Sequence, residues 1–463
     1  MNEVPAALLK KLREHRQEHV LLGWEKFNAR QRTDLVRQLE AIDLDEIAGL
    51  YADRNKPSGV PTIDRLAPIP TEKASEVDAA TIALGRESLA KGELAVLLVA
   101  GGQGTRLGFD HPKGMFPIGP VSNKTLFEIH TDKVFALVRR YGKAVPFLVM
   151  TSPATHDETE EYFREKQYFG LGRENVIFFQ QGTMPAVDLA TGQLLLESPG
   201  VLFTSPNGHG GTLTALSDSG LLAELEKRGI RHLFYFQVDN PLVKIGDPAF
   251  LGRHIALRSE ASSKAIAKAF PKEKMGVFAL IDGRCGIVEY SDLPDELAHA
   301  SQDGRLVYGS GSPAIHLFDV NFLKRITEGR KKLPFHFARK KVLHVSGTGE
   351  AIDPQTENAL KFEMFIFDSL PMAERYLVME SPREEEFSPV KNKDGVDSPD
   401  TCRRDLSNLA GAWLELAGVK VPRDQKGNVS VPLEISPRYA LDAEELAAKI
   451  GTGRTIESAT YLE

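Results

Sequence analysis

The sequence predicts an α/β fold in which a mostly parallel central sheet is joined to a helical N-terminal arm and a small C-terminal module. Residues 94–100 (LAVLLVA) form a continuous apolar run, which is typical of a strand buried on both faces of a parallel sheet. Comparable strand patterns follow, and helical patterns separate the earlier ones, which indicates βαβ units. The later strands are expected at 145–152, 175–182, 232–240, 263–270 and 274–282.

The segments on either side of this sheet predict the domain organisation. Residues 6–50 place apolar side chains near the helical period, so we expect a helical arm there. A stretch rich in proline and polar residues at 54–75 follows as a linker, and the next helix ends near Gly92. One more helix is expected at 400–418, before a strand-like piece at 427–436. The predicted domains are therefore residues 1–90, 91–394 and 395–463.

Composition and charge exclude several classes of protein. The 463 residues are 42% hydrophobic and 26% charged, which suits a chain with a large buried core. The net charge of −7 argues against a general nucleic-acid binder. Two cysteines, Cys285 and Cys402, are too few for a disulfide scaffold or a cysteine-rich zinc site. The chain shows no signal peptide and no apolar run of the ~18 residues that a membrane span needs, so we expect a cytoplasmic protein without a membrane partner. The sequence leaves the oligomeric state open, and a monomer is the favoured expectation.

A glycine-rich loop follows the first strand directly. Residues 101–108 (GGQGTRLG) contain four glycines, which let the backbone approach a ligand and can form an anion-binding nest. Arg106 and Lys113 add two positive charges, so the pattern predicts a loop that wraps a triphosphate. An ordinary turn between strand and helix is the alternative. No GKS or GKT follows, which excludes a Walker loop, and the absence of GxGxxG argues against a dinucleotide oxidoreductase.

A carboxylate ends another apolar strand. Asp239 closes the run 233–239 (LFYFQVD), and open α/β sheets bind their ligands at the carboxyl ends of strands. Mg²⁺ in proteins takes one or two carboxylates together with phosphate oxygens. We therefore expect Asp239 to be a magnesium ligand. The alternative is a simple turn formed with Asn240 and Pro241.

These residues belong to a longer series of motifs. The string GGQGTRLG, followed by Pro112, Lys113 and Gly114, resembles the signature of the eukaryotic-type UDP-sugar pyrophosphorylases, and the UDP-N-acetylglucosamine pyrophosphorylases are the most similar branch. The resemblance implies a Rossmann-like, GT-A-like nucleotidyltransferase fold. It also implies an enzyme that joins UTP to a sugar 1-phosphate, releases pyrophosphate and uses Mg²⁺. Further matching blocks are residues 19–40, 123–127, 180–186, 238–244 and 288–291, together with Lys361 and Lys391.

The resemblance implies a role for each matching residue. Cations would neutralise the phosphates, because nucleotidyl transfer needs charge neutralisation more than covalent chemistry. The attacking sugar phosphate is already ionised, so neither a catalytic histidine nor a serine triad is expected. The implied cations are Arg106, Lys113, Lys361 and Lys391; the sugar-phosphate ligands are His209, Glu289, Tyr290 and Lys391; the UTP ligands are Val99, Ala100, Gly101, Gly102, Lys113, Gln181, Gly208, Asp239 and Lys361.

One loop leaves the choice of sugar open. His209 stands between two glycines where the N-acetylglucosamine branch usually has Asn, whereas Gly-His-Gly resembles the UDP-glucose and broad UDP-sugar branches. Gly211 again resembles the N-acetylglucosamine branch, and residues 312–316 lack the asparagines of the family. We expect N-acetylglucosamine 1-phosphate to be the preferred sugar. The alternatives are UDP-glucose synthesis, a broad UDP-sugar activity, an inactive nucleotide-sugar sensor, and a scaffold that acts through its helical arm.

Overall fold

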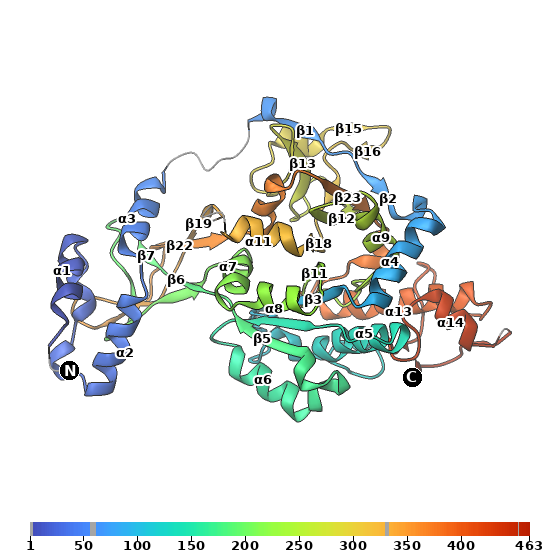
Figure 1. Cartoon of the computed structure of the whole chain (residues 1–463), viewed down its shortest axis with the longest axis horizontal. Coiled ribbons are helices and arrows are strands. Elements are labelled where there is room, and N and C mark those ends of the chain that lie inside the picture. Colours follow the sequence, from blue (N-terminus) through green and yellow to red (C-terminus); the bar gives the residue numbers. More distant parts are fainter. Residues whose placement is uncertain (1–2, 56–61, 329–332, 452) are drawn as a thin grey trace. The chain divides into compact units, whose positions relative to one another are not determined.

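The computed structural model describes residues 3–55, 62–328, 333–451 and 453–463 (Figure 1). The chain forms two compact units. The first unit contains Met1–Val60, Gln181–Thr214 and Lys332–Asp368, and the second contains Pro61–Gln180, Ala215–Lys331 and Ser369–Glu463. The sequence indicated three consecutive segments instead, and their boundaries at residues 90 and 394 stay a prediction. Part of the predicted linker, residues 56–61, lies outside the described residues.

The second unit is built on one large sheet with the strand order β1-β13-β17-β12-β18-β11-β3-β4-β5, in which β14 pairs with β13, and β23 joins β12 to β2. Strands β5, β4, β3 and β11 are parallel, whereas β18 is antiparallel to β11 and β12. The predicted α/β fold with a mostly parallel central sheet is thus confirmed. The sheet strands are β1 (Leu66–Pro68), β2 (Glu72–Lys73), β3 (Leu94–Val99), β4 (Phe147–Thr151), β5 (Val176–Gln180), β11 (His232–Gln237), β12 (Ala261–Ala267), β13 (Val277–Ile281), β14 (Arg284–Val288), β17 (Ser310–Gly311), β18 (His316–Asp319) and β23 (Tyr376–Glu380).

Each strand expected between residues 94 and 282 is present, and its ends differ from the expected ones by at most three residues. The helices between them begin and end at residue types that commonly cap helices. Thr125 and Glu128 form a capping box at the start of α5, and Gly92 ends α4 with a left-handed φ of +76°. The helices of this unit are α4 (Ala79–Lys91), α5 (Leu126–Tyr141), α6 (His156–Glu165), α8 (Leu221–Lys227), α9 (Pro248–Ala256), α10 (Asp295–His299), α11 (Val320–Glu328), α12 (Arg383–Glu386), α13 (Pro399–Leu416) and α14 (Ala443–Lys449); α7 (Gly211–Asp218) lies where the chain passes from the first unit to the second.

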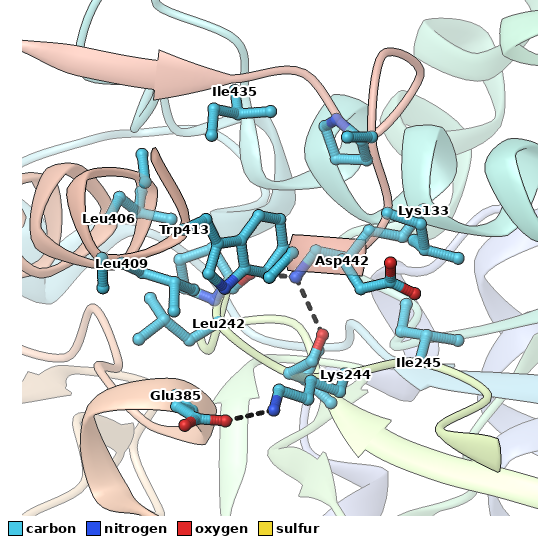
Figure 2. A pocket seen from close by; sticks show the side chains of 18 of the residues that line it. Lys133, Leu242, Lys244, Ile245, Glu385, Leu406, Leu409, Trp413, Ile435 and Asp442 are labelled. Atoms are coloured by element: carbon cyan, nitrogen blue, oxygen red, sulfur yellow. Dashed lines mark hydrogen bonds and ion pairs between the residues drawn. The ribbon is translucent and has the colours of Figure 1, made fainter. Parts of the chain in front are cut away.

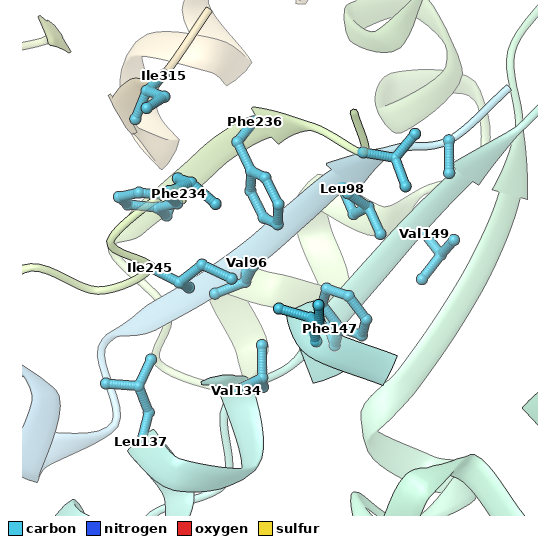
Figure 3. Packing of buried hydrophobic residues seen from close by; sticks show 14 of the residues in the cluster. Val96, Leu98, Val134, Leu137, Phe147, Val149, Phe234, Phe236, Ile245 and Ile315 are labelled. Carbon is cyan, nitrogen blue, oxygen red and sulfur yellow. The ribbon is translucent and has the colours of Figure 1, made fainter. Parts of the chain in front are cut away.

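The main hydrophobic core lies between the central strands and α5 (Figure 3). Alternate residues of a strand share one face, so Val96 and Leu98 of β3 point the same way, and both are fully buried. Leu137 of α5 belongs to the same cluster, as do alternate residues of β4 and β11. Fully burying one such side chain contributes about 1.5–3 kcal/mol, so this core holds the strand ends in register.

The C-terminal residues form a small cluster of their own, which contains Leu414, Leu433 and Leu446. Ion pairs connect this part to α5, because Arg140 contacts Asp442 through one guanidinium nitrogen at 2.5 Å and a neighbouring glutamate through another. The predicted helix at 400–418 is α13, and the strand-like piece contains β24 (Leu433–Ile435), which pairs with β25 (Thr460–Leu462). None of the helices in the described part of the chain has the length and apolar character needed to cross a membrane.

The first unit contains the N-terminal helices and several short antiparallel strand pairs. The helices bury Leu12, Leu35 and Ile47 in a core that also includes Phe362 of β22, which confirms the helical character of the N-terminal arm. β22 lies between β19 and β7. The elements are α1 (Ala6–Glu14), α2 (Ala29–Glu40), α3 (Leu44–Asp53), β6 (Thr183–Pro185), β7 (Val187–Asp188), β8 (Leu196–Ser198), β9 (Val201–Leu202), β10 (Thr204–Pro206), β19 (Phe335–Lys340), β20 (His344–Val345), β21 (Ala351–Ile352) and β22 (Ala359–Met364); a separate two-stranded ribbon in the second unit is β15 (Ser301–Gln302) with β16 (Arg305–Leu306).

Candidate active site

The glycine loop leaves the central strand and folds back on itself. Ala100 follows β3, and its N–H donates to the Met150 carbonyl (2.8 Å), which holds the start of the loop against β4. Further along, the Lys113 N–H donates to the Gly102 carbonyl (3.0 Å). This bond brings Lys113 back beside the exposed start of the loop.

The glycines of this loop have different structural roles. A Cβ on Gly102 would meet no atom within 4 Å, so its backbone is open to a ligand. A Cβ on Gly104 would lie 2.7 Å from the Phe109 carbonyl oxygen, and one on Gly114 would overlap the Phe127 ring. Those two glycines are required for packing inside the loop. The room for a close backbone approach therefore lies at the beginning of the loop.

The two cations of the loop are available to a ligand. Lys113 is half-buried and Arg106 is exposed. Within the described residues, neither side chain has a hydrogen-bond or ion-pair partner. Charge-assisted hydrogen bonds to phosphate oxygens are among the strongest that proteins make, so both groups can serve the predicted phosphate binding.

Asp239 leaves the sheet at the same edge as the glycine loop. β11 and β3 are parallel neighbours with Gln237 opposite Val99, and the Val238 N–H donates to the Val99 carbonyl (3.0 Å). Because the carboxyl ends of parallel strands meet at one edge, Asp239 and the residues after Val99 emerge together. Asp239 is 9% exposed, and its carboxylate has no hydrogen-bond or ion-pair partner among the residues that the structure describes. A nearly buried carboxylate of this kind is costly without a cation, so it favours a cationic ligand.

A backbone contact brings Lys391 to this edge. The Val390 N–H donates to the Asp239 carbonyl (2.8 Å). The Lys391 ammonium lies 4.0 Å from an Asp397 carboxylate oxygen and 5.2 Å from the centre of the Phe387 ring. Its side chain remains 37% exposed and thus accessible. The second unit therefore brings Lys391, Asp239 and the glycine loop to one edge of the sheet.

A buried ion cluster, which was not among the residues predicted from the sequence, supports these segments. Lys264 in β12 is fully buried, and its ammonium contacts the carboxylates of Asp247 (2.8 Å) and Glu386. Burial disfavours the charged lysine, but the two carboxylates outweigh it and raise the pKa of Lys264. The Asn240 side chain also donates to the Glu386 carbonyl (2.7 Å). The cluster thus joins the segment after β11 to the segment that leads to Lys391. A lysine in the middle of a strand that belongs to the central sheet was the signal that could have revealed it.

Glu289 and Tyr290 lie in another part of the same sheet. They follow β14, where Val288 is opposite Val277; Val277 is opposite Gly311, which in turn pairs with β12. This register places them beside the carboxyl end of β12, and β18 separates β12 from β11. Tyr290 is 47% exposed. Their contact with the sugar stays a prediction.

The first unit carries the other predicted residues, and its glycine-rich turn packs against backbone. The Met364 N–H donates to the Asn207 carbonyl (2.7 Å), and the Gly210 N–H donates to the Met364 carbonyl (2.8 Å). Gly208 has a φ of +83°, and a Cβ there would overlap the Met364 carbonyl. A Cβ on Gly210 would lie 2.6 Å from the Phe365 nitrogen. These glycines are therefore required for the fold of the turn.

His209 is held in this turn by the chain after β22. The Ile366 N–H donates to His209 Nδ1 (3.2 Å), and the His209 ring stacks on Phe365 with 5.3 Å between the ring centres. Burial, together with the nearby His336, lowers the pKa of His209 to about 4. His209 is therefore neutral at pH 7, and its accepting Nδ1 places the ring proton on Nε2. Its one remaining polar group is thus a donor, which could serve a sugar hydroxyl.

Lys361 and Gln181 complete the predicted set. Lys361 lies in β22, where burial lowers its pKa and Glu363 opposes that shift, and its ammonium is 4.9 Å from the centre of the Phe203 ring. Gln181 directly follows β5 and is 8% exposed. The predicted residues are therefore divided between the two units. Within the first unit, the contacts of Lys361 and Gln181 with UTP stay predictions.

The features of the second unit define a class of protein. A parallel sheet edge carries an open glycine loop, cations without partners in the described chain, and a nearly buried carboxylate, which together suit an enzyme that handles nucleotide phosphates. The fold and this edge define a nucleotidyltransferase. The sequence profile described as UTP–glucose-1-phosphate uridylyltransferase matches residues 51–397. The chain belongs to this family of uridylyltransferases, as its motifs predicted.

Individual relatives resemble nearly the whole chain. UDP-N-acetylglucosamine diphosphorylase 2 of Arabidopsis thaliana is 35% identical over 482 residues, covering 98% of this chain and 93% of the relative. UDP-N-acetylglucosamine pyrophosphorylase of Saccharomyces cerevisiae is 36% identical over 457 residues, covering 93% of this chain and 94% of the relative. The solved UDP-N-acetylglucosamine pyrophosphorylase of Trypanosoma brucei in complex with inhibitor has a TM-score of 0.81 at 28% identity, covering 96% of this chain and 94% of that chain. The similarity thus extends far beyond the glycine loop.

The residues present fit a divalent metal ion, which pyrophosphorylases of this family generally use. Asp239 offers a carboxylate that is nearly buried and that no cation of the described chain neutralises. The described residues contain no group of three or more His, Cys, Asp or Glu side chains that could hold a metal by themselves. An ion bound by one carboxylate and by substrate phosphates matches the way in which proteins usually hold Mg²⁺.

Proposed function

We propose that the protein transfers the uridylyl group of UTP to N-acetylglucosamine 1-phosphate, forming UDP-N-acetylglucosamine and releasing pyrophosphate. The observation that carries this proposal is the 35–36% identity, over nearly the whole chain, to relatives named as UDP-N-acetylglucosamine diphosphorylase or pyrophosphorylase. The open backbone at Gly102 and the available charge of Lys113 support it, because they suit the binding of a nucleoside triphosphate. The inactive sensor and the scaffold receive no such support, since the loop, Lys113 and Asp239 are all retained.

The chemistry needs little from the protein beyond positioning and charge. An oxygen of the sugar phosphate attacks the α-phosphorus of UTP in line, and the bond to pyrophosphate breaks. The attacking oxygen is already ionised at pH 7, so no side chain has to remove a proton. In this proposal Arg106 and Lys113 bind the departing phosphates. Lys361 and Lys391 bind the remaining phosphate oxygens.

We further propose that Mg²⁺ is the metal and that Asp239 is its protein ligand. The bound ion supplies positive charge to the phosphates during transfer. The position of Asp239 at the loop's edge of the sheet supports this role. The substrates are small molecules. The net charge and the absence of long apolar runs support a cytoplasmic protein that binds neither nucleic acid nor membrane. A monomer is the favoured oligomeric state in this proposal.

A second candidate is the use of glucose 1-phosphate, alone or together with the N-acetylated sugar. The observation that favours it is the environment of His209, whose remaining polar group is a single N–H donor. An asparagine at this position would offer a donor and an acceptor together. Because the two side chains cannot bind the same hydroxyl in the same pose, we expect both sugars to be used, with a slight preference for N-acetylglucosamine 1-phosphate.

The test is pyrophosphate release by the purified protein from UTP and a panel of sugar 1-phosphates. We expect release with N-acetylglucosamine 1-phosphate and with glucose 1-phosphate, only when Mg²⁺ is present, and none in excess EDTA. Lys143→Ala, a change at an exposed lysine outside the predicted set, should leave the rate unchanged. Absence of release with every sugar would overturn the proposed function, and full activity in EDTA would overturn the metal assignment.

A further inference from the structure

The second unit contains a cavity of about 760 Å³ that the proposed reaction does not use (Figure 2). It lies between α5, residues 241–248, α13 and residues 434–444. Its volume falls in the range of about 300–1,000 Å³ that is usual for sites of small organic ligands. The lining includes two aromatic residues, Tyr141 and Trp413. Much of the wall is apolar, with the side chains of Leu242, Ile245, Leu406, Leu409, Trp413 and Ile435.

Most charged groups of this wall are already paired. Arg140 contacts Asp442 (2.5 Å), and Lys244 contacts Glu385. The other lining arginine is paired with a glutamate of α13, and the remaining lining carboxylates accept bonds from neighbouring arginines, hydroxyls or backbone N–H groups, except for the exposed Glu384. With the exception of Glu384, these groups therefore have hydrogen-bond or ion-pair partners within the protein.

Lys133 differs from the other lining cations. Its ammonium donates to two backbone carbonyls, those of Pro241 and Val243 (2.8 Å for the latter), and to no carboxylate. An ammonium group has three donors, so one N–H remains for a further acceptor, and no carboxylate contacts the group. Burial lowers the pKa of Lys133 to about 7, although Glu386 opposes the shift. A bound anion would offset the unfavourable burial of the charged ammonium.

We propose that this cavity binds an organic anion with an apolar, aromatic-sized body and one negatively charged group, which pairs with Lys133 while the body packs against Trp413 and Leu409. The volume, the apolar wall and the single lining cation held only by neutral carbonyls all favour such a ligand. Nothing in the proposed reaction requires the cavity, so this is a second binding site of the chain.

Occupancy of the cavity has a consequence for the reaction. The two carbonyls that Lys133 holds follow Asp239 in the chain by two and four residues. An anion that draws the ammonium toward itself loosens these bonds and shifts the segment of the metal ligand. We therefore expect a bound anion to raise the Mg²⁺ concentration needed for half-maximal activity. This consequence rests on the proposed function, whereas the binding does not.

The test uses the fluorescent anion 8-anilinonaphthalene-1-sulfonate with the full-length protein. The chain has two tryptophans, so in Trp24→Phe protein the only tryptophan is Trp413, at the cavity wall. We expect one probe per chain, with energy transfer from Trp413. Ala412→Phe, which narrows the cavity, should weaken binding at least tenfold. N-phenyl-1-naphthylamine, which has the same aromatic body without the charge, should bind at least tenfold more weakly than the anion.

Two further variants separate charge from shape. Lys133→Met keeps the aliphatic part of the side chain, so it should weaken binding of the anion without changing binding of the neutral probe. Lys143→Met is the control for net charge and should change the binding of neither probe. If Lys133→Met fails to fold, the Ala412→Phe variant and the comparison with the neutral probe still test whether the cavity binds the anion. Equal binding of the two probes, or anion binding that survives Ala412→Phe in protein with an unchanged melting temperature, would overturn the proposal. Binding without any pyrophosphate release would leave the site intact and count against the proposed function alone.

Discussion

Two glycine-rich turns carry predicted substrate ligands, and the glycine at the start of the first turn has surroundings opposite to those of the glycines in the second. In the second unit, the space around Gly102 is open, and two cations beside it have no partner in the described chain. In the first unit, Gly208 and Gly210 are pressed against the backbone at the end of β22. The same residue type therefore leaves room for a ligand in one turn and for the protein's own backbone in the other.

This difference has a consequence for reading motifs. A glycine beside a ligand is required by function, and its replacement should affect activity more than stability. A glycine against backbone is required by folding, so its replacement should affect stability first. Replacing one glycine in each turn tests whether Gly102 and Gly210 differ in this way.

The largest effect is expected for Gly210→Ala. The new Cβ would lie 2.6 Å from backbone atoms of Met364 and Phe365, so we expect the free energy of unfolding to fall by about 3 kcal/mol. Urea denaturation measures this change. The matched variant Gly102→Ala should stay within about 0.5 kcal/mol of wild type, because its Cβ enters open space. It should lower kcat/KM for UTP instead. Equal losses of stability in the two variants would contradict the comparison.

Lys113→Ala tests the charge beside the open turn. One charge-assisted contact to the leaving pyrophosphate in a dry site is worth about 3 kcal/mol, so kcat/KM should fall by roughly a hundredfold with an unchanged melting temperature. Lys113→Arg should restore only part of the activity, because a planar guanidinium differs in shape from an ammonium. Steady-state kinetics measure both. Activity of the alanine variant within about twofold of wild type would remove Lys113 from the site.

Asp239→Asn tests the carboxylate at the same edge. The amide keeps the shape of the side chain and removes the charge that holds a hard cation, so the Mg²⁺ concentration for half-maximal activity should rise by roughly tenfold or more. Circular dichroism should show an intact fold. A Mg²⁺ titration identical to that of wild type would place the metal ligand elsewhere.

His209→Asn tests the closely packed turn and has the smallest expected effect. We expect the ratio of kcat/KM values to shift toward N-acetylglucosamine 1-phosphate by about tenfold, as for one polar contact of about 1.4 kcal/mol. Kinetics with both sugars on both proteins provide the measurement. If the ratio does not change, the stacking of His209 on Phe365 is its whole role and the residue does not select the sugar.

Much of this protein follows from the sequence by itself. The strands between residues 94 and 282, the loop after Val99 and the helical arm are local patterns of hydrophobicity and glycine, and the structure contains each of them. The family also follows, because its motifs are contiguous strings. Neighbouring residues carry these signals, so no knowledge of distant contacts is needed.

Only the tertiary structure showed which side chains meet. Lys264 pairs with Glu386 across 122 positions, and Lys133 bonds to carbonyls more than 100 positions away. The glycines of the two turns look alike in sequence, yet their surroundings come from Phe109 in one turn and from Met364 in the other. Packing determines these surroundings, and it depends on which segments the sheet register brings together. The burial of a charge, the cavity behind α5 and the room beside Gly102 are therefore properties of the folded chain alone.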